Sequence, residues 1–365
     1  MKILLSARDP AAAQVILNLV EYLHTKEIVP TVLASGAACS MLENLDCKFC
    51  CYDEPENGSV NLDLLREFVR NALDNIQPDV IIAGSSGPDA GIDEVLIEQS
   101  GNIRTYVVQD FWGDVNTRLD VYPDCYLVLD SYAAKLTSQR VSSEVFEVGS
   151  VKHDKYYTMD CDSVRKNSRK KLQVGVPQTI VGFYGMPLSE FGGYFKTINE
   201  LAGALPETVK VLYRPHPKEN VDSIAKTKEA FSDYDFYFDE SLTLEESLLA
   251  CDLVISCYSS CGIDSELLHR SANQSSTVSI FMLQNEEIYE NYRSYSKLDD
   301  VPLSIQNRSI SIFDSAILSD VISKYLVEKN RAEFLSGAEK DITEVCASQN
   351  VIDKVNVDFY KTTIV

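Results

Sequence analysis

Short apolar runs that alternate with amphipathic helical patterns constrain the fold of this chain more than any other feature. The run "KILLS" at residues 2–6 precedes a pattern over 11–24 that places Val15, Leu19 and Tyr22 on one helical face. Further strand-like runs in the first part of the chain are "PTVLAS", "CKFCCY", "DVIIAGS", "TYVVQD", "CYLVLDS" and "VFEVGS". Because these strands are apolar on both faces and helical patterns separate them, we expect a parallel sheet that is covered on both sides.

The alternation stops after Gly149 and resumes near residue 178. The second series of strand-like runs is "TIVGFYG", "VKVLY", "YDFYF", "DLVIS" and "TVSIFM". We therefore predict an α/β protein with two Rossmann-like, doubly wound domains that face a central cleft. The expected parts are a first domain at 1–150, a linker at 151–177, a second domain at 178–313 and a helical segment at 314–365.

The charge balance excludes two classes of partner. Of the 365 residues, 33 are Lys or Arg and 55 are Asp or Glu, which gives a formal net charge of −22. A negative field of this size repels nucleic acid and gives no general attraction to anionic lipid. The amino terminus "MKILLSARDP" does not resemble a signal peptide. We expect a cytoplasmic protein with at most peripheral membrane association.

A basic stretch and a cysteine cluster each allow two interpretations. Residues 165–171, "RKNSRKK", form either a solvated linker helix or a basic lip near an anionic ligand. Most of the ten cysteines lie in apolar contexts, so we expect reduced thiols in the core. Cys47, Cys50 and Cys51 are close in sequence, but no second pair or nearby histidine accompanies them, which disfavours a zinc or redox site.

The stretch "VLYRPHPKEN" ends a strand in a histidine between two prolines. Each proline fixes its own φ and disfavours helix in the residue before it, so His216 lies in a stiff, extended loop. Arg214 precedes it and Lys218 follows it, and a histidine among cations suits an anion such as phosphate. The alternative is a structural histidine at the end of a strand.

The stretch "ISCYSSCGIDSELL" places hydroxyl groups between a buried strand and a helix. Ser259, Ser260 and Gly262 would present hydroxyls, backbone N–H groups and the positive end of a helix dipole to a phosphate. Asp264 or Glu266 could accept hydrogen bonds from ribose hydroxyls. Serines also cap helices throughout proteins, so this motif gains weight only together with His216.

A glycine-rich turn follows the first strand of the second domain in "FYGMPLSEFGGY". Gly185 there would allow the backbone to approach a ligand closely, although an ordinary turn explains it as well. The two Asp-x-Asp spacings, "DYD" and "DCD", lie at a strand start and in the linker. Neither is expected at the carboxyl end of a strand, so we expect neither a metal ion nor another cofactor.

Three acids stand at the ends of apolar strands in the first domain. Asp9, Asp89 and Asp110 follow the strands that end in "SARDP", "GSSGPDAG" and "VVQDFWGD". Carboxylates that face one crevice are candidates for a general base, and Asp110 is the first choice, then Asp89, then Asp9. Trp112, beside Asp110, would either stack on an acceptor or pack in the core.

The motifs "RPHP" and "YSSCGID" resemble the second half of GT-B glycosyltransferases over about residues 178–285. The resemblance is closest to the group with His-Pro and Ser-Ser motifs, which contains CDP-glycerol glycerophosphotransferases and bacterial sialyltransferases. It implies that His216, Ser259 and Ser260 bind the donor phosphate and that Asp264 matches an acid of the glycerophosphotransferases. The second domain also resembles the non-hydrolysing UDP-GlcNAc 2-epimerases.

These observations favour a metal-independent enzyme that transfers a glycosyl or polyol-phosphate unit from a nucleotide-activated donor. His216 would also act in catalysis through the donor phosphate, with Arg214 as electrostatic support. The acceptor would be a saccharide or lipid-linked molecule of surface polysaccharide or glycolipid synthesis, and the resemblance implies a CMP- or CDP-linked donor. Two alternatives remain, a UDP-sugar 2-epimerase or hydrolase of the same fold and a non-catalytic subunit that binds nucleotide sugars.

Overall fold

The chain folds into two units, each built on its own parallel sheet. The computed structural model describes residues 1–54, 60–87, 89–174, 178–271, 277–337 and 346–363. The first unit is Met1–Tyr157 with Asp341–Val365, and the second unit is Thr158–Lys340. The boundary between Tyr157 and Thr158 lies within the segment where a linker is expected, whose residues 175–177 are outside the described part.

The first unit contains a seven-stranded parallel sheet in the order β3-β2-β1-β4-β5-β6-β7. Its strands are β1 (Ile3–Ala7), β2 (Thr31–Ser35), β3 (Lys48–Tyr52), β4 (Val80–Gly84), β5 (Arg104–Val108), β6 (Cys125–Val128) and β7 (Glu144–Glu147). The winding direction reverses between β1 and β4, which is the topological switch point where ligands bind in such sheets.

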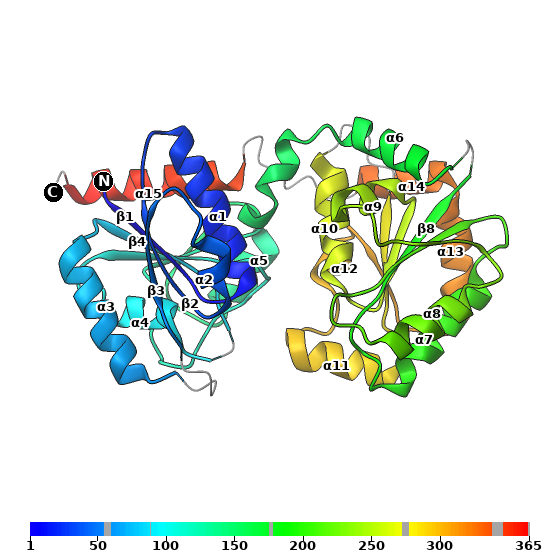
Figure 1. Ribbon diagram of the computed structural model, residues 1–365, viewed down its shortest axis with the longest axis horizontal. Coiled ribbons are helices and arrows are strands. Elements are labelled where there is room, and N and C mark those ends of the chain that lie inside the picture. The colour runs from blue at the N-terminus through cyan, green and yellow to red at the C-terminus, as the bar shows by residue number, and fades with distance from the viewer. Residues whose placement is uncertain (55–59, 88, 175–177, 272–276, 338–345, 364–365) are drawn as a thin grey trace. The chain divides into compact units, whose positions relative to one another are not determined.

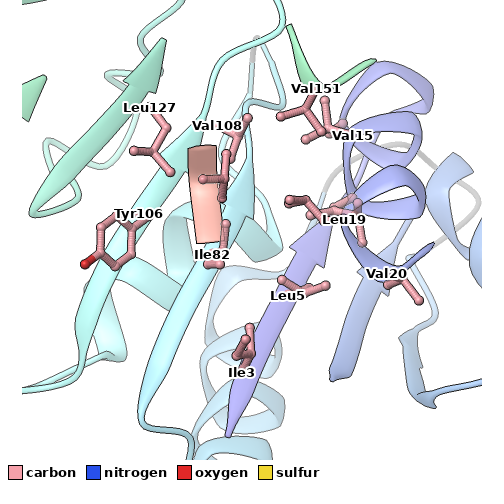
Figure 2. Close-up of a cluster of buried hydrophobic side chains, with 14 of the residues drawn as sticks. Ile3, Leu5, Val15, Leu19, Val20, Ile82, Tyr106, Val108, Leu127 and Val151 are labelled. Carbon is pink, nitrogen blue, oxygen red and sulfur yellow. The ribbon is translucent and has the colours of Figure 1, made fainter. Parts of the chain in front are cut away.

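Helices cover this sheet on both faces. They are α1 (Pro10–Thr25), α2 (Ala37–Leu42), α3 (Leu62–Ile76), α4 (Ile92–Gln99), α5 (Ser131–Ser138) and the 3₁₀ helix η1 (Val151–Thr158). Figure 2 shows Val15 and Leu19 of α1 against Leu5, Ile82 and Val108 of the strands. All five side chains are buried, and each contributes roughly 1.5–3 kcal/mol by leaving water.

The last helix of the chain, α15 (Ala347–Thr363), belongs to the first unit although it follows the second unit in sequence. It lies along the first unit beside α1, in red in Figure 1. Val351 and Val355 are buried in the core of the first sheet. Asp154 of η1 accepts hydrogen bonds from the first two backbone N–H groups of the helix, at 2.7 and 2.9 Å. The amino and carboxyl ends of the chain thus build one unit.

The second unit contains a six-stranded parallel sheet in the order β10-β9-β8-β11-β12-β13. Its strands are β8 (Ile180–Tyr184), β9 (Lys210–Arg214), β10 (Asp235–Phe238), β11 (Leu253–Ser256), β12 (Val278–Met282) and β13 (Ile310–Ile312). The switch point of this sheet lies between β8 and β11, so the loops after these two strands border the expected ligand site.

The helices of the second unit again lie on both faces of its sheet. They are α6 (Cys161–Lys171), α7 (Gly192–Ala204), α8 (Val221–Ala230), α9 (Leu244–Ala250), α10 (Ser260–Ser271), α11 (Glu286–Ser296), α12 (Pro302–Ile305), the 3₁₀ helix η2 (Ser315–Ile317), α13 (Leu318–Leu326) and α14 (Glu328–Gly337). The expected capping box at the start of α9 is confirmed, because Thr243 and Glu246 exchange side chain to backbone hydrogen bonds of 3.2 and 3.1 Å.

The basic stretch 165–171 is part of α6, and its arginines have structural partners. Arg165 and Arg169 bind the carboxylate of Asp252 at 2.6 and 3.0 Å. The same guanidinium groups donate to the backbone carbonyls of Ala250 and Cys251 at the end of α9. Cations at a helix carboxyl terminus are favoured by the helix dipole. These two arginines therefore hold α6 on α9. The stretch is helical, as the first interpretation expected, but its two arginines are half-buried in ion pairs rather than solvated.

The expectation that the cysteines are reduced is wrong for one pair. Cys39 of α2 and Cys51 of β3 form a disulfide whose Cα atoms are 5.8 Å apart. The sequence motif pointed to Cys51 together with Cys47 and Cys50, but these two remain free thiols. The partner, Cys39, is twelve residues away and meets Cys51 only because α2 packs on β3.

The expected α/β class with two doubly wound parallel sheets is confirmed. Within the described ranges, no helix combines the length and the apolar character that crossing a bilayer requires. Twelve of the strands were expected from apolar runs, whereas β13 has only three residues and was missed. Both switch points place polar loops at the carboxyl edge of a sheet, and these two edges hold the candidate site residues.

Candidate functional site

Three neighbouring strands of the second sheet end in residues that the sequence points to. β9 leads to His216, β8 to Gly185 and β11 to Ser259 and Ser260. The strands lie in the order β9-β8-β11, so their carboxyl ends form one continuous edge. The loops are also joined directly, because the backbone N–H of Gly185 donates to the carbonyl of Arg214 at 2.9 Å. We call this set of loops the second-sheet edge.

His216 is half-buried, and its hydrogen bonds define its tautomer. The backbone N–H of Lys218 donates to the ring Nδ1 at 3.0 Å. In the neutral imidazole the proton must then lie on Nε2, which is left as a donor. Burial lowers the pKa of His216, an effect that the charge of Glu219 partly opposes. At neutral pH His216 is therefore suited to donate a hydrogen bond to an anion rather than to act as a cation.

Glu219 organises the second-sheet edge, and sequence reasoning missed it. It is 8% exposed, and one carboxylate oxygen accepts from the backbone N–H of His216 at 3.1 Å. The other oxygen accepts from the hydroxyls of Tyr194 and Ser223 at 3.3 and 2.7 Å. A Cβ added at Gly185 would lie 2.2 Å from the Glu219 carboxylate. Gly185 is thus explained by the approach of Glu219, and an acid three residues after the histidine was the available signal.

The start of α10 supplies hydroxyl and backbone groups to the same edge. Ser259 is buried, and its Oγ accepts from the backbone N–H of Cys261 at 3.3 Å. Its own N–H donates to the hydroxyl of Ser256 at 3.1 Å, which fixes the end of β11. Ser260 is exposed on the first turn of the helix. Ser259 therefore caps α10, while Ser260 is the hydroxyl that a ligand in solution can reach.

Two other residues of α10 serve its packing. A Cβ on Gly262 would lie 2.5 Å from the ring of Phe281 in β12, so this glycine allows the helix to approach the sheet. Both carboxylate oxygens of Glu266 bind the guanidinium group of Arg308, at 2.9 and 2.6 Å, and both side chains are buried. The expected role of Glu266 as a ribose acceptor is replaced by this ion pair. Asp264 is also buried on the same helix.

Arg214 has a buried acidic partner that the sequence did not reveal. Its guanidinium group binds Asp239 at 2.8 Å and the carbonyl of Leu242 at 2.9 Å. The side chain of Asp239 is 0% exposed. The positive charge expected beside His216 is therefore balanced within the protein, and Arg214 supports the loop after β10 as well as the second-sheet edge.

In the first unit, Asp9 and Asp89 are positioned very differently. Asp9 caps α1, because one carboxylate oxygen accepts from the N–H of Ala12 at 2.9 Å. Its other oxygen accepts from the N–H of Gly87 at 3.4 Å, which joins the loops after β1 and β4. The Asp89 side chain is 76% exposed and lies 3.6 Å from Arg118. Solvent exposure leaves Asp89 without the surroundings that tune a general base.

Asp110 follows β5, and its surroundings raise its pKa strongly. Burial and the neighbouring Asp114 raise the pKa of Asp110 to about 7, and Lys152 opposes the shift. A carboxyl group with a pKa near the working pH is suited to accept and release a proton. Asp114, four residues later, was not chosen from the sequence. Burial also raises the pKa of Asp114, whose carboxylate accepts from the Ser85 hydroxyl at 2.6 Å.

We call the loops that follow β1, β4 and β5, up to the first turns of their helices, the first-sheet edge. Two further buried acids at this edge were also missed. Asp93 accepts from the hydroxyl of Ser6 at 2.5 Å, and Glu94 accepts from the backbone N–H of Gly91 at 2.8 Å. Burial raises the pKa of Asp93 to about 6 and that of Glu94 to about 7. They lie in the first turn of α4, where acids are common as caps, so no feature of the sequence distinguishes them.

Trp112 belongs to the core. It is 3% exposed, and its indole N–H donates to Asp130 at 2.8 Å. Of the two sequence interpretations, packing is therefore the one that the structure bears out. The anchored indole fixes the loop that carries Asp110, so its contribution to the first-sheet edge is indirect.

Neither Asp-x-Asp pair lies at the carboxyl end of a strand. Asp235 begins β10, at the amino end of the strand, and binds Lys210 at 2.8 Å. Asp160 and Asp162 lie at the start of α6, where Asp160 caps the helix by accepting from Ser163. Within the described part of the chain, no group of three or more His, Cys, Asp or Glu side chains is placed to hold a metal ion.

Comparisons with proteins of known structure identify the type of fold. No family model matches the chain, and no curated relative does. A UDP-GlcNAc 2-epimerase from Neisseria meningitidis bound to UDP-GlcNAc is similar, with a TM-score of 0.68 and 12% identity over 97% of this chain and 99% of that one. MurG from Acinetobacter baumannii has a TM-score of 0.63 and 11% identity over 98% of this chain and 99% of that one. The wall teichoic acid polymerase TagF with CDPG has a TM-score of 0.54 and 12% identity over 99% of this chain and 89% of that one. The chain shares the GT-B type fold of these proteins.

Proposed function

We propose that the protein is an enzyme of glycan biosynthesis that transfers a glycosyl or polyol-phosphate unit from a nucleotide-activated donor to a hydroxyl acceptor. The arrangement of residues on the second-sheet edge is the observation that supports this proposal. There, three adjacent strands end in His216, Gly185 and the serines of α10, around the buried Glu219. A cytoplasmic location and an acceptor from surface polysaccharide or glycolipid synthesis are part of the proposal.

The second-sheet edge would bind the phosphate of the donor. His216 Nε2 and the Ser260 hydroxyl, which lies on the first turn of α10 at the positive end of the helix dipole, are neutral donors that suit phosphate oxygens. In the reaction, the bond to the nucleotide phosphate breaks and negative charge grows on that phosphate. Donors that are already oriented stabilise this charge more in the transition state than in the ground state. Because neutral hydrogen-bond donors can stabilise such a charge, the proposed chemistry is metal-independent.

Asp110 would be the general base. The acceptor hydroxyl gives its proton to the Asp110 carboxylate, and its oxygen forms the new bond to the donor carbon or phosphorus. A pKa of about 7 leaves a substantial fraction of Asp110 ionised at neutral pH and lets the product acid lose its proton again. Asp9 is the second choice, since it shares the first-sheet edge, and the exposed Asp89 is now the third.

A second candidate function has support of its own. UDP-GlcNAc 2-epimerases are among the similar structures, with coverage as complete as that of the transferases. An epimerase or hydrolase would release nucleotide from a donor, or interconvert two nucleotide sugars, without an acceptor. A non-catalytic subunit would bind nucleotide without turnover. These outcomes separate the three functions.

Nucleotide binding by His216 is the first test. Thermal unfolding of wild type, His216→Ala and Asp233→Asn is followed with UDP, CMP, CDP, GDP and ADP. A ligand at about 100 times its Kd adds about 2.7 kcal/mol to the unfolding free energy. We expect one nucleotide to stabilise wild type and Asp233→Asn equally, because Asp233 is exposed away from the edge. Loss of a hydrogen bond to a charged group, roughly 1.5–3 kcal/mol, would weaken binding to His216→Ala about 10- to 100-fold.

The responding nucleotide then selects the donors for turnover assays. The CMP- and CDP-linked donors that the motif resemblance implies are tested beside UDP-linked ones, since the similar structures include proteins bound to UDP-GlcNAc and to CDPG. If no nucleotide stabilises wild type, or if His216→Ala responds as wild type does, the second-sheet edge is not the donor site and the proposal fails.

A further inference from the structure

A disulfide joins α2 to the strand at one edge of the first sheet. Cys39 lies in the first turn of α2, and its partner Cys51 lies in β3, the first strand in the sheet order. Both cysteines are half-buried, while Ala37, Ser40 and Cys50 beside them are exposed. A reductant in solution can therefore approach the bond, and exposed disulfides are exchanged more readily than buried ones.

The two free thiols nearest to this bond in sequence are Cys47 and Cys50. Successive side chains of a strand point to opposite faces, so Cys50 lies on the face of β3 opposite to Cys51. Cys47 precedes the strand, four residues and roughly 13 Å before Cys51. Neither thiol is placed to replace a sulfur of the bond. The pair therefore exists as one disulfide or as two thiols.

The start of α2 supports the loop after β1. Ala38, the residue before Cys39, donates its backbone N–H to the carbonyl of Arg8 at 3.0 Å. A Cβ added at Gly36 would lie 3.2 Å from the same carbonyl, so this backbone also packs against Arg8. The Arg8 guanidinium in turn donates to the carbonyl of Asp89 at 2.6 Å. Contacts within one or a few residues of the disulfide thus reach the first-sheet edge.

α2 and β3 are weakly held apart from the disulfide. α2 has only six residues, and its N-cap, Gly36, has no side chain with which to cap the helix. A helix of this length is not stable by itself and depends on its packing. β3 pairs with β2 on one side, and its residues are exposed or half-buried. Breaking the bond between Cys39 and Cys51 should therefore let α2 open more easily.

We propose that the Cys39–Cys51 disulfide is a redox-sensitive cross-link that stabilises the first-sheet edge. Reduction breaks the Sγ–Sγ bond. A dithiol, such as a protein of the thioredoxin class, gives two electrons and two protons, becomes a disulfide itself and leaves two cysteine thiols. Glutathione disulfide reverses the step and becomes two glutathione thiols. In the reduced protein α2 holds Arg8, and with it the neighbouring Asp9, less firmly.

The proposal rests on the proposed function only for the cytoplasmic location and for the reaction that the cross-link would regulate. Thiols are kept reduced in the cytoplasm, and the disulfides found there are mostly transient or redox-sensing. A permanent structural bond is therefore not expected at this position. A bond that forms and breaks with the redox state of its surroundings is.

The redox equilibrium is measured first, on wild type in glutathione buffers of increasing reducing strength. Free thiols are alkylated and located by mass spectrometry. We expect Cys39 and Cys51 to become alkylated together, and to be protected again by glutathione disulfide. Cys50→Ser removes an exposed thiol that can form a mixed disulfide, and it should give the same transition. Alkylation of Cys39 and Cys51 in every buffer, or in none, would overturn the proposal.

Hydrogen exchange of backbone amides then tests the effect on the fold. We expect residues 37–42 and residues 8 and 9 to exchange several-fold faster after reduction with dithiothreitol, while β8 of the second unit stays unchanged. Cys39→Ser should exchange like the reduced protein with or without dithiothreitol. Cys47→Ser, which removes a half-buried free thiol near the same strand, should respond as wild type does. Equal exchange of α2 in oxidised and reduced wild type contradicts the proposal, even if no variant folds.

Turnover separates this proposal from the proposed function. With an active donor and acceptor, kcat/KM should fall several-fold on reduction and return on reoxidation, and Cys39→Ser should not respond. Nucleotide binding should stay the same, because the residues of the second-sheet edge belong to the second unit. A protein without turnover, but with redox-dependent exchange, refutes the transferase and leaves the cross-link standing. Equal turnover of the oxidised and reduced forms refutes its regulatory role.

Discussion

At the residue scale, the carboxylate of Glu219 connects three parts of the second-sheet edge. It binds the backbone of His216 and the hydroxyls of Tyr194 and Ser223, and it fills the space beside Gly185. The histidine loop therefore depends on a buried charge whose hydrogen bonds replace those with water. Changes that displace Glu219 should affect ligand binding even though Glu219 itself is buried.

Gly185→Ala tests this dependence. A methyl group 2.2 Å from the Glu219 carboxylate must displace it, so we expect a loss of stability of roughly 1–3 kcal/mol and weaker nucleotide binding. Gly203→Ala is the matched control, because no atom lies within 4 Å of a Cβ at that position of α7. It should stabilise the protein by up to about 1 kcal/mol. Urea unfolding and nucleotide thermal shifts measure both effects, and equal behaviour of the two variants would contradict this account.

At the element scale, α6 is held on α9 by a buried ionic cluster. Asp252 accepts from Arg165, Arg169 and Arg331, at 2.6, 3.0 and 3.3 Å. The Asp252 side chain is 7% exposed and that of Arg331 is 5% exposed. The arginines are also bound to backbone carbonyls, so the cluster joins the helix that opens the second unit to the start of β11. Removing the single anion leaves three cations close together.

Asp252→Asn should therefore destabilise the second unit strongly. Breaking a buried ion pair by removing one partner costs about 3–5 kcal/mol, because the remaining charge is buried and unpaired. Urea unfolding measures the change in the free energy of unfolding. Asp233→Asn removes an exposed acid of the same unit and should change stability by no more than about 0.5 kcal/mol. A loss below about 1 kcal/mol in Asp252→Asn would show that the carbonyls alone hold α6.

Elements were predictable where periodicity was strong. Twelve apolar runs became strands, and the central ones are buried on both faces, while the amphipathic pattern at 11–24 became α1. α11 was missed, since its buried positions are Ile288, Tyr292 and Ser296 in an otherwise polar segment. A serine in a buried helical position gives no hydrophobic signal, and the hydroxyl of Ser296 instead accepts from the backbone N–H of Leu298 at 3.1 Å.

The candidate site was predictable only in part, for a related reason. His216 and the serines of α10 stand out because prolines and hydroxyls interrupt apolar strands. Glu219 and Asp114 resemble ordinary surface acids in the sequence, but packing buries Glu219 and half-buries Asp114. Glu266 was misjudged because its partner Arg308 lies 42 residues away in sequence. Contacts of this kind depend on the strand order, which local patterns do not contain.

At the scale of the whole molecule, buried acids should make stability depend on pH. Burial raises the pKa values of Asp93 and Glu94 above their usual range, to about 6 and about 7. The folded protein then binds more protons than the unfolded chain between about pH 4 and pH 7. The free energy of unfolding must fall as the pH rises through this window. Asp252 has a lowered pKa and acts in the opposite sense, but only below about pH 4.

Asp93→Asn should reduce this pH dependence. The amide can still accept from Ser6, but it carries no charge, so the variant should lose less stability than wild type between pH 5 and pH 8. Each unit by which the pKa is raised corresponds to about 1.4 kcal/mol, which sets the scale of the difference. Urea unfolding at several pH values measures it. Parallel pH profiles of the two proteins would show that Asp93 ionises as freely when folded as when unfolded.

The packing of α15 on the first unit affects the order in which the two units fold during synthesis. The first sheet is complete at Glu147, but the helix that covers it begins at Ala347. At about 5–20 residues per second, the ribosome needs roughly 10–40 s to make the intervening 200 residues. During that time the nascent first unit exposes the apolar surface that Val351 and Val355 later cover. The second unit, which is continuous in sequence, can finish folding first, so the amino-terminal half of this protein completes its fold last.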